Sequence, residues 1–106
     1  MGDKKYQVEL RPAALNKFAE HVAFVSKKSP NAAVQLRVDF KNAVEFILYN
    51  PNGFMKYTPV KRRGMGYRLF LFGKGNRYRL IFSVYKDKVI VHDVQDCRQS
   101  PNKSLV

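Results

Sequence analysis

The chain has 106 residues, 45% of them hydrophobic, and it carries 20 Lys and Arg against 8 Asp and Glu, a formal net charge of +12. A chain of this length forms one domain around one modest core, so we treat residues 1–106 as a single domain. The apolar content excludes global disorder. The single cysteine, Cys97, excludes an internal disulfide framework.

Nothing in the sequence predicts a membrane segment. No stretch approaches the roughly 18–20 consecutive apolar residues that a span requires, and the first eleven residues lack the apolar core of a secretory signal. A lone thiol also suits a reducing compartment. We therefore expect a cytoplasmic protein with no membrane partner.

The positive charge is unevenly distributed. No acidic residue lies between Glu45 and Asp87. The cations of this interval are Lys56, Lys61, Arg62, Arg63, Arg68, Lys74, Arg77, Arg79 and Lys86. A field of one sign attracts phosphates and speeds encounter with polyanions, whereas an ordinary solvated surface usually mixes its signs. The pattern favours a nucleic-acid partner over a merely basic surface.

The N-terminal half predicts a strand followed by two helices. Residues 6–10 alternate between apolar and polar side chains, as a strand does. Pro12 suits the first turn of a helix, whose apolar stripe is Leu15, Phe18, Val22 and Val25. Ser29-Pro30 predicts an N-cap followed by the first residue of a second helix that runs to about Tyr49. Its stripe is Ala33, Leu36, Phe40, Ala43, Val44 and Ile47. The short connection predicts an antiparallel helix hairpin.

The C-terminal half predicts three strands, at 67–72, 77–85 and 88–94, joined by tight turns into an antiparallel meander. In the middle strand one face carries Tyr78, Leu80, Phe82 and Val84, which we expect to pack on the helices. The other face carries Arg77, Arg79, Ile81, Ser83 and Tyr85. We therefore predict an α+β domain of order β-α-α-β-β-β, with the helices on one face of the sheet and the cations gathered on the other. Residues 99–106 are polar, and we expect them to be flexible.

Four segments in this order resemble the RelE/ParE superfamily of bacterial toxins. Residues 75–84, Gly-Asn-Arg-Tyr-Arg-Leu-Ile-Phe-Ser-Val, resemble the central strand of the family. Residues 88–91, followed by Asp96-Cys97-Arg98, resemble the last strand and the arginine after it. Ser29-Pro30-Asn31-Ala32-Ala33 is similar to the opening of the second family helix, and Asn50-Pro51 to its end. The resemblance spans roughly residues 6–98.

The resemblance implies the toxin of a type II toxin–antitoxin pair, silenced by a cognate antitoxin protein. RelE-like members cleave mRNA in the ribosomal decoding site without a metal or other cofactor, whereas ParE-like members inhibit DNA gyrase. We expect the RelE-like activity, with gyrase inhibition as the first alternative. A non-toxic, basic nucleic-acid-binding module is the second alternative.

Metal-free RNA cleavage needs fixed cations that stabilise the charge of a phosphorane, and the planar fork of arginine suits phosphate. Arg79 and Arg98 match the arginines of the family's central strand and of the segment after its last strand, so we predict them as the catalytic pair. The predicted RNA- and phosphate-binding residues are Lys61, Arg62, Arg63, Arg68, Lys74, Arg77 and Tyr85. Tyr85 is included because an aromatic ring can stack a base. No Cys/His cluster has the spacing of metal ligands.

Two departures from the RelE-like pattern favour the gyrase inhibitor or a divergent member. Phe70 and Phe72 occupy the positions where RelE-like members carry lysines, and no tyrosine follows Arg98. Asp93 and Asp96 could orient a histidine or an arginine, but we favour their placement in a surface loop. Cys97 is expected to be a small loop-filling residue.

Overall fold

The computed structural model describes residues 5–58, 66–99 and 104–106. The helices and strands are β1 (Gln7–Leu10), α1 (Pro12–Ser26), α2 (Pro30–Ile47), β2 (Met55–Lys56), β3 (Arg68–Phe72), β4 (Tyr78–Tyr85) and β5 (Lys88–Asp96). Short 3-10 turns lie at Pro51–Gly53 and Lys74–Asn76. The α+β class is therefore confirmed. Lys61, Arg62 and Arg63, three of the predicted phosphate contacts, lie outside the described residues.

The strands form one five-stranded mixed sheet in the order β1-β5-β4-β3-β2. The predicted meander is its antiparallel part, β3-β4-β5. The predicted strand order was incomplete, because β2 adds a fifth strand that pairs only Met55 with Leu69 and Lys56 with Arg68. Two residues are too few to produce a detectable alternation. β1 pairs with β5 in parallel, which a connection as long as the one through both helices allows.

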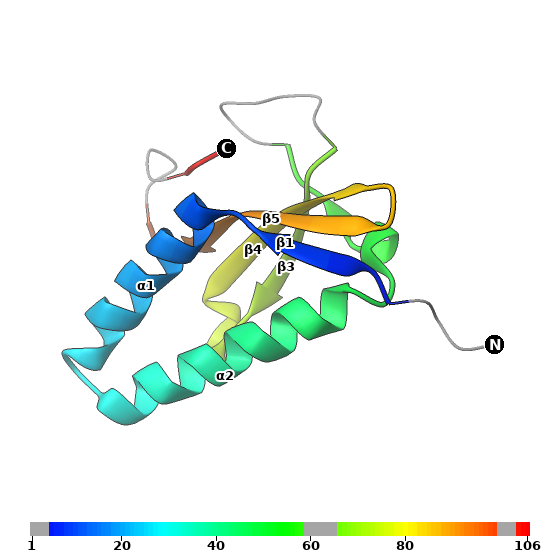
Figure 1. Cartoon of the computed structure of the whole chain (residues 1–106). Helices are drawn as coiled ribbons and strands as arrows, with labels where there is room; N and C mark the ends of the chain where they lie inside the picture. The colour runs from blue at the N-terminus through cyan, green and yellow to red at the C-terminus, as the bar shows by residue number, and fades with distance from the viewer. Residues whose placement is uncertain (1–4, 59–65, 100–103) are drawn as a thin grey trace.

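Both helices lie on one side of the sheet and diverge from their short connection (Figure 1). α1 packs mainly on β5, and α2 contacts β3. The predicted cap of α2 is confirmed, since the backbone N–H of Ala32 donates to Ser29 Oγ over 3.1 Å. The predicted stripe of α2 is also confirmed: Ala33, Leu36, Phe40, Ala43, Val44 and Ile47 are buried. No helix in the described part of the chain is long and apolar enough to cross a membrane.

The predicted stripe of α1 is wrong at one position. The buried residues of this helix are Ala14, Phe18, His21 and Val22, whereas Leu15 is 40% exposed. β1 pairs only with Lys88–Val91, so the remaining edge of β5 is left to α1. His21 closes part of that edge by donating from Nε2 to the carbonyl oxygen of Val94 over 2.8 Å. Successive helical residues lie about 100° apart. Because His21 faces the core, Leu15 of the same helix faces away from it.

The core lies between the helices and the sheet. Leu80 and Phe82 of β4 are fully buried there together with Val89, Val91 and Val94 of β5. A register shift at Ile81/Phe82 makes the spacing of the three valines possible, because Phe82 pairs with Val91 while Ile81 pairs with Asp93. The extra residue, His92, is a β-bulge. The predicted inward face of β4 is thus confirmed.

The other face of the sheet, which the helices leave uncovered, is called the open face below. It carries a second, smaller apolar cluster of Tyr67, Ile81 and Val106, with Tyr57 and Leu69 packed against it. The expectation that residues 99–106 are flexible is wrong for 104–106, because Ser104 and Val106 are both buried. Apolar contact of Val106 with this cluster, and hydrogen bonds described below, hold these last residues in place.

Two Leu→Ala substitutions test the orientation of the helices. Leu36→Ala removes a side chain that is 5% exposed, so it should lower the free energy of unfolding by about 2–5 kcal/mol. Leu15→Ala makes the same chemical change at an exposed position of α1, and it should cost under about 1 kcal/mol. Urea denaturation measures both. Equal losses in the two variants would contradict the observed orientation of α1.

Candidate nucleic-acid interface

Arg79 lies on the open face of β4, between Leu71 of β3 and Gln95 of β5 in the sheet register. Its guanidinium carbon lies 5.7 Å from the centroid of the Tyr57 ring, an arrangement that lets a cation interact with an aromatic face. The Nε atom is buried and has no hydrogen-bond partner in the part of the chain that the structure describes. A buried donor left without an acceptor costs free energy, so Arg79 is a candidate to receive an anionic ligand.

Tyr67 and His92 add polar groups to the same face. The hydroxyl of Tyr67 is buried and, among the described residues, it too has no hydrogen-bond partner. Its ring meets the His92 ring edge-on, with centroids 5.0 Å apart. His92 Nε2 lies 2.7 Å from Ser83 Oγ. We did not predict these residues as part of the site. The alternation of β4 places Ser83 beside Arg79 on one face, but His92 reaches this face through a bulge that no sequence pattern marks.

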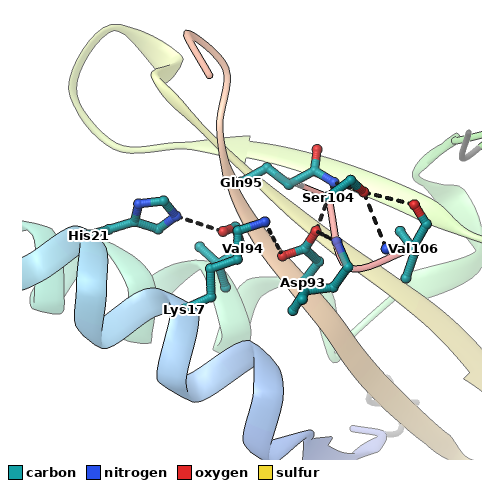
Figure 2. Close-up of polar contacts among 8 residues, drawn as sticks. Lys17, His21, Asp93, Val94, Gln95, Ser104 and Val106 are labelled. Carbon is teal, nitrogen blue, oxygen red and sulfur yellow. Dashed lines mark hydrogen bonds and ion pairs between the residues drawn. The ribbon is translucent and has the colours of Figure 1, made fainter. Parts of the chain in front are cut away.

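Figure 2 shows the polar contacts of Asp93, a fully buried carboxylate. Lys17 of α1 places Nζ 2.9 Å from Oδ1. Oδ2 accepts hydrogen bonds from Gln95 Nε2 over 2.8 Å and from the backbone N–H of Leu105 over 2.9 Å. The preferred expectation of a surface loop is therefore wrong for Asp93. A buried charge must be paired, so this carboxylate links α1, β5 and residues 104–106.

The C-terminal residues complete this network. Gln95 Nε2 also donates to Ser104 Oγ over 2.9 Å, and the Ser104 hydroxyl donates to the carbonyl oxygen of Val106 over 2.8 Å. Gln95 is the cross-strand neighbour of Arg79. The segment 104–106 therefore borders the Arg79 site, and its position depends on Asp93 and Gln95.

Asp96 lies at the end of β5 and holds two arginines. Its Oδ2 accepts from Arg77 through Nη2 over 3.2 Å and Nε over 3.4 Å. Its Oδ1 accepts from the backbone N–H of Arg98 over 2.9 Å and lies 3.5 Å from the Nε of Arg98. Asp96 is buried, so the placement in a surface loop is wrong here too. The alternative, a carboxylate that orients arginines, is what the structure contains.

Arg79 and Arg98, the predicted catalytic pair, lie on different sides of the sheet. Asp96 pairs with Tyr78, whose ring belongs to the core under the helices. Arg98 follows Asp96 and lines a cleft of about 820 Å³ with residues of α1, including His21 and Phe24. Arg79 occupies the opposite, open face because side chains alternate along a strand. The structure therefore does not bring these two arginines into one cluster.

Arg68, Lys74 and Arg77, the other predicted cations that the structure describes, also do not join Arg79 on the open face. Arg68 pairs with Phe82 in the register, on the helix side, and donates from Nη1 to the carbonyl oxygen of Phe54 over 2.7 Å. Lys74 and Arg77 line a cleft against α2. The expectation that the C-terminal cations gather on the open face is therefore wrong for Arg68 and Arg77. Arg77 lies just before β4 rather than within it, and Arg68 points toward the helices. The order of these residues in the sequence reveals neither placement.

Tyr85, the predicted base-stacking residue, is exposed at the other end of β4. Lys86 Nζ lies 5.4 Å from the centroid of its ring. Tyr85 lies six positions after Arg79, roughly 20 Å along a strand. Tyr57, which already contacts Arg79, is better placed to stack a base at this site.

Phe70 and Phe72 belong to the apolar layer under the helices. The residues of β3 that share a face with Arg79 are Leu69 and Leu71. None of the four can bind phosphate or move a proton. The departure from the RelE-like lysines therefore holds on both faces of β3.

Burial raises the pKa of Tyr78 above its usual value near 10, although the neighbouring Arg77 opposes the shift. The folded state thus holds this phenol neutral. Because the unfolded chain ionises first as the pH rises, the contribution of Tyr78 to stability is complete below about pH 10 and declines above it.

Comparison with known proteins finds no match to a family model and no significant match among curated sequences. Among the residues that the structure describes, no group of three His, Cys, Asp or Glu side chains is placed to hold a metal ion. The resemblance to the toxins stays a prediction, and the site must be judged by its own geometry.

Substitution of Lys17 tests the buried ion pair. Lys17→Met leaves the Asp93 carboxylate buried without its cation, and this should lower the free energy of unfolding by about 3–5 kcal/mol. Lys5→Met removes a lysine whose partner, Glu45, is half exposed, and its unfolding midpoint should match that of the unmodified protein. Urea denaturation at neutral pH compares them. An unchanged midpoint in Lys17→Met would show that Asp93 does not depend on this pair.

Tyr67→Phe tests whether the buried hydroxyl serves the fold. Removal of an unpartnered buried polar group should leave stability unchanged or raise it by up to about 1 kcal/mol. Thermal unfolding measures the change. The control is Tyr6→Phe, at a half-buried tyrosine that directly precedes β1. A marked loss of stability in Tyr67→Phe alone would mean that the hydroxyl of Tyr67 makes a stabilising hydrogen bond within the protein.

Proposed function

We propose that this protein is the toxin of a type II toxin–antitoxin pair and acts in the cytoplasm as a RelE-like, ribosome-dependent mRNA endoribonuclease. The observation that supports the proposal best is Arg79, a half-buried arginine on the open face. Its Nε has no hydrogen-bond partner among the described residues, and an aromatic ring lies under its guanidinium. The half-buried guanidinium of Arg79 would donate to a phosphate of mRNA, and Tyr57 would lie beside the adjoining base.

Cleavage requires the 2′ hydroxyl of the ribose to lose a proton and attack the adjacent phosphorus, with departure of the 5′ oxygen. In the proposed mechanism Arg79 stabilises the charge that develops on the phosphorane oxygens. His92 lies on the same face, and an imidazole can accept the proton of the 2′ hydroxyl and return a proton to the departing 5′ oxygen. The proposed partners are the ribosome with its mRNA and an antitoxin whose acidic, amphipathic segment offsets the net charge of +12.

A ParE-like inhibitor of DNA gyrase without nuclease activity is the second candidate. The observation that favours it is the apolar surface that β3 offers beside Arg79, where Leu69 and Leu71 share the face of that arginine and Leu71 is 39% exposed. An exposed apolar surface suits contact with a protein partner better than contact with RNA. A non-toxic basic binding module is the third candidate.

Arg79→Ala is the variant that tests the proposal. Added to a translation extract, the unmodified protein should cut mRNA at defined codon positions, and Arg79→Ala should slow cleavage by about 100-fold or more, the range for loss of one transition-state donor. Arg37→Ala removes an exposed arginine of α2 and the same charge, and it should cleave at the normal rate. Primer extension on the recovered message measures the cuts.

Three outcomes separate the candidates. Intact message together with inhibited DNA supercoiling by gyrase would replace the nuclease with the gyrase inhibitor. Normal bacterial growth during induced expression would exclude both toxins. Equal loss of cleavage in Arg79→Ala and Arg37→Ala would show that charge alone, and not the open-face site, carries the activity.

A further inference from the structure

The buried carboxylate of Asp96 binds two arginines, Arg77 and Arg98. The mechanism proposed at Arg79 uses neither of them. Arg77 and Arg98 reach Asp96 from different segments, one before β4 and one after β5. The three side chains sum to a charge of +1, and two guanidinium groups fixed by one carboxylate keep donors in excess. Such an arrangement orders cations without neutralising them.

Arg77 pairs the buried carboxylate of Asp96, but the exposure of Arg98 argues against a purely structural role for the second arginine. The side chain of Arg98 is 62% exposed and that of Arg77 is 27% exposed. Ion pairs at exposed positions contribute little to stability, because solvent screens them. Within the described residues, both guanidinium groups retain nitrogens that make no hydrogen bond: Asp96 takes Nε and Nη2 of Arg77, and Nε of Arg98.

We propose that Arg77, Asp96 and Arg98 form a phosphate clamp, a second binding site for the RNA backbone that is separate from Arg79. Asp96 is its positioning residue, and each of the two arginines donates to a phosphate of the RNA backbone through its remaining nitrogens. The inference deepens the proposed function and rests on it for the identity of the ligand as single-stranded RNA. Arginine forks that are already ordered bind phosphate without the entropy cost of being fixed.

The position of the clamp relative to Arg79 gives the two sites a common use. Arg77 and Arg79 flank Tyr78 and lie toward opposite sides of the sheet, at the end where β4 begins and β5 finishes. A nucleic-acid strand that crosses this end of the sheet meets the clamp on the helix side and Arg79 on the open face. The clamp therefore holds the nucleic-acid strand in a fixed position, and Arg79 acts on a phosphate of that nucleic acid.

Asp96→Asn gives a test whose sign separates positioning from charge. The substitution raises the net charge from +12 to +13, and a charge effect alone would strengthen binding of a polyanion. The clamp predicts the reverse, about fivefold weaker binding of a fluorescent single-stranded RNA oligonucleotide, because the freed arginines must be ordered again on binding. Asp87→Asn makes the same charge change at an exposed turn residue and should bind slightly more tightly. Stronger binding in both variants would overturn the clamp.

Arg98→Lys covers the case in which Asp96→Asn does not fold. It keeps the charge at an exposed position but removes the fork, so it should weaken RNA binding, and binding equal to that of the unmodified protein would overturn the inference. Arg98→Ala should also reduce the slope of log K against log salt by about 0.7, one phosphate contact on a single strand. An unchanged slope would count against a phosphate at Arg98.

Two further measurements keep this inference distinct from the proposed function. Arg79→Ala in the same binding assay reports on the open face: if it binds RNA normally while Asp96→Asn is impaired, the clamp binds RNA independently of Arg79, whose catalytic role is decided by the cleavage assay. If the protein binds no RNA at all, inorganic phosphate still decides the inference. Titration should shift the Nε–H resonance of Arg98 in the unmodified protein and not in Asp96→Asn, whereas equal shifts or none would overturn the clamp.

Discussion

The pairing of Lys17 with the buried carboxylate of Asp93 is the interaction on which the rest of the structure depends. It joins α1 to β5 at the part of the strand that β1 leaves unpaired, and the same carboxylate anchors residues 104–106 through the backbone of Leu105. A bulge at His92 is what allows Asp93 to take this position while Val91 and Val94 both face the core. A change in that register would displace the hydrophobic face and the polar network together.

The chemistry that we propose lies at the same end of the sheet. β4 and β5 place Arg79 on one face and the Arg77–Asp96–Arg98 cluster on the other, where the carboxylate of Asp96 holds both arginines. In this proposal, a few positioned arginines bind the nucleic acid, and the net positive charge of the chain only attracts it. A long-range electrostatic field attracts a polyanion to the whole surface. Only ordered guanidinium groups can bind a phosphate at one defined position.

Sequence patterns predicted the class, the two helices, the stripe of α2 and the inward face of β4, because these follow from periodicity and capping, which are local properties. They missed β2, the inward turn of His21 and the docking of residues 104–106, because each depends on a partner distant in the chain. For the site, alternation placed Arg79 on the open face. It could not show that Asp96 would recruit Arg77 and Arg98 to the other side, since a contact between residues 19 positions apart has no signature in one sequence.

A map of backbone amide shifts on addition of single-stranded RNA tests the central claim, that the β4–β5 end of the sheet is the nucleic-acid interface. The account predicts that the largest shifts fall on Tyr57, residues 77–79 and residues 95–98, with little change along the exposed side of α2. Shifts concentrated on the helix hairpin, or spread evenly over the basic surface, would contradict it.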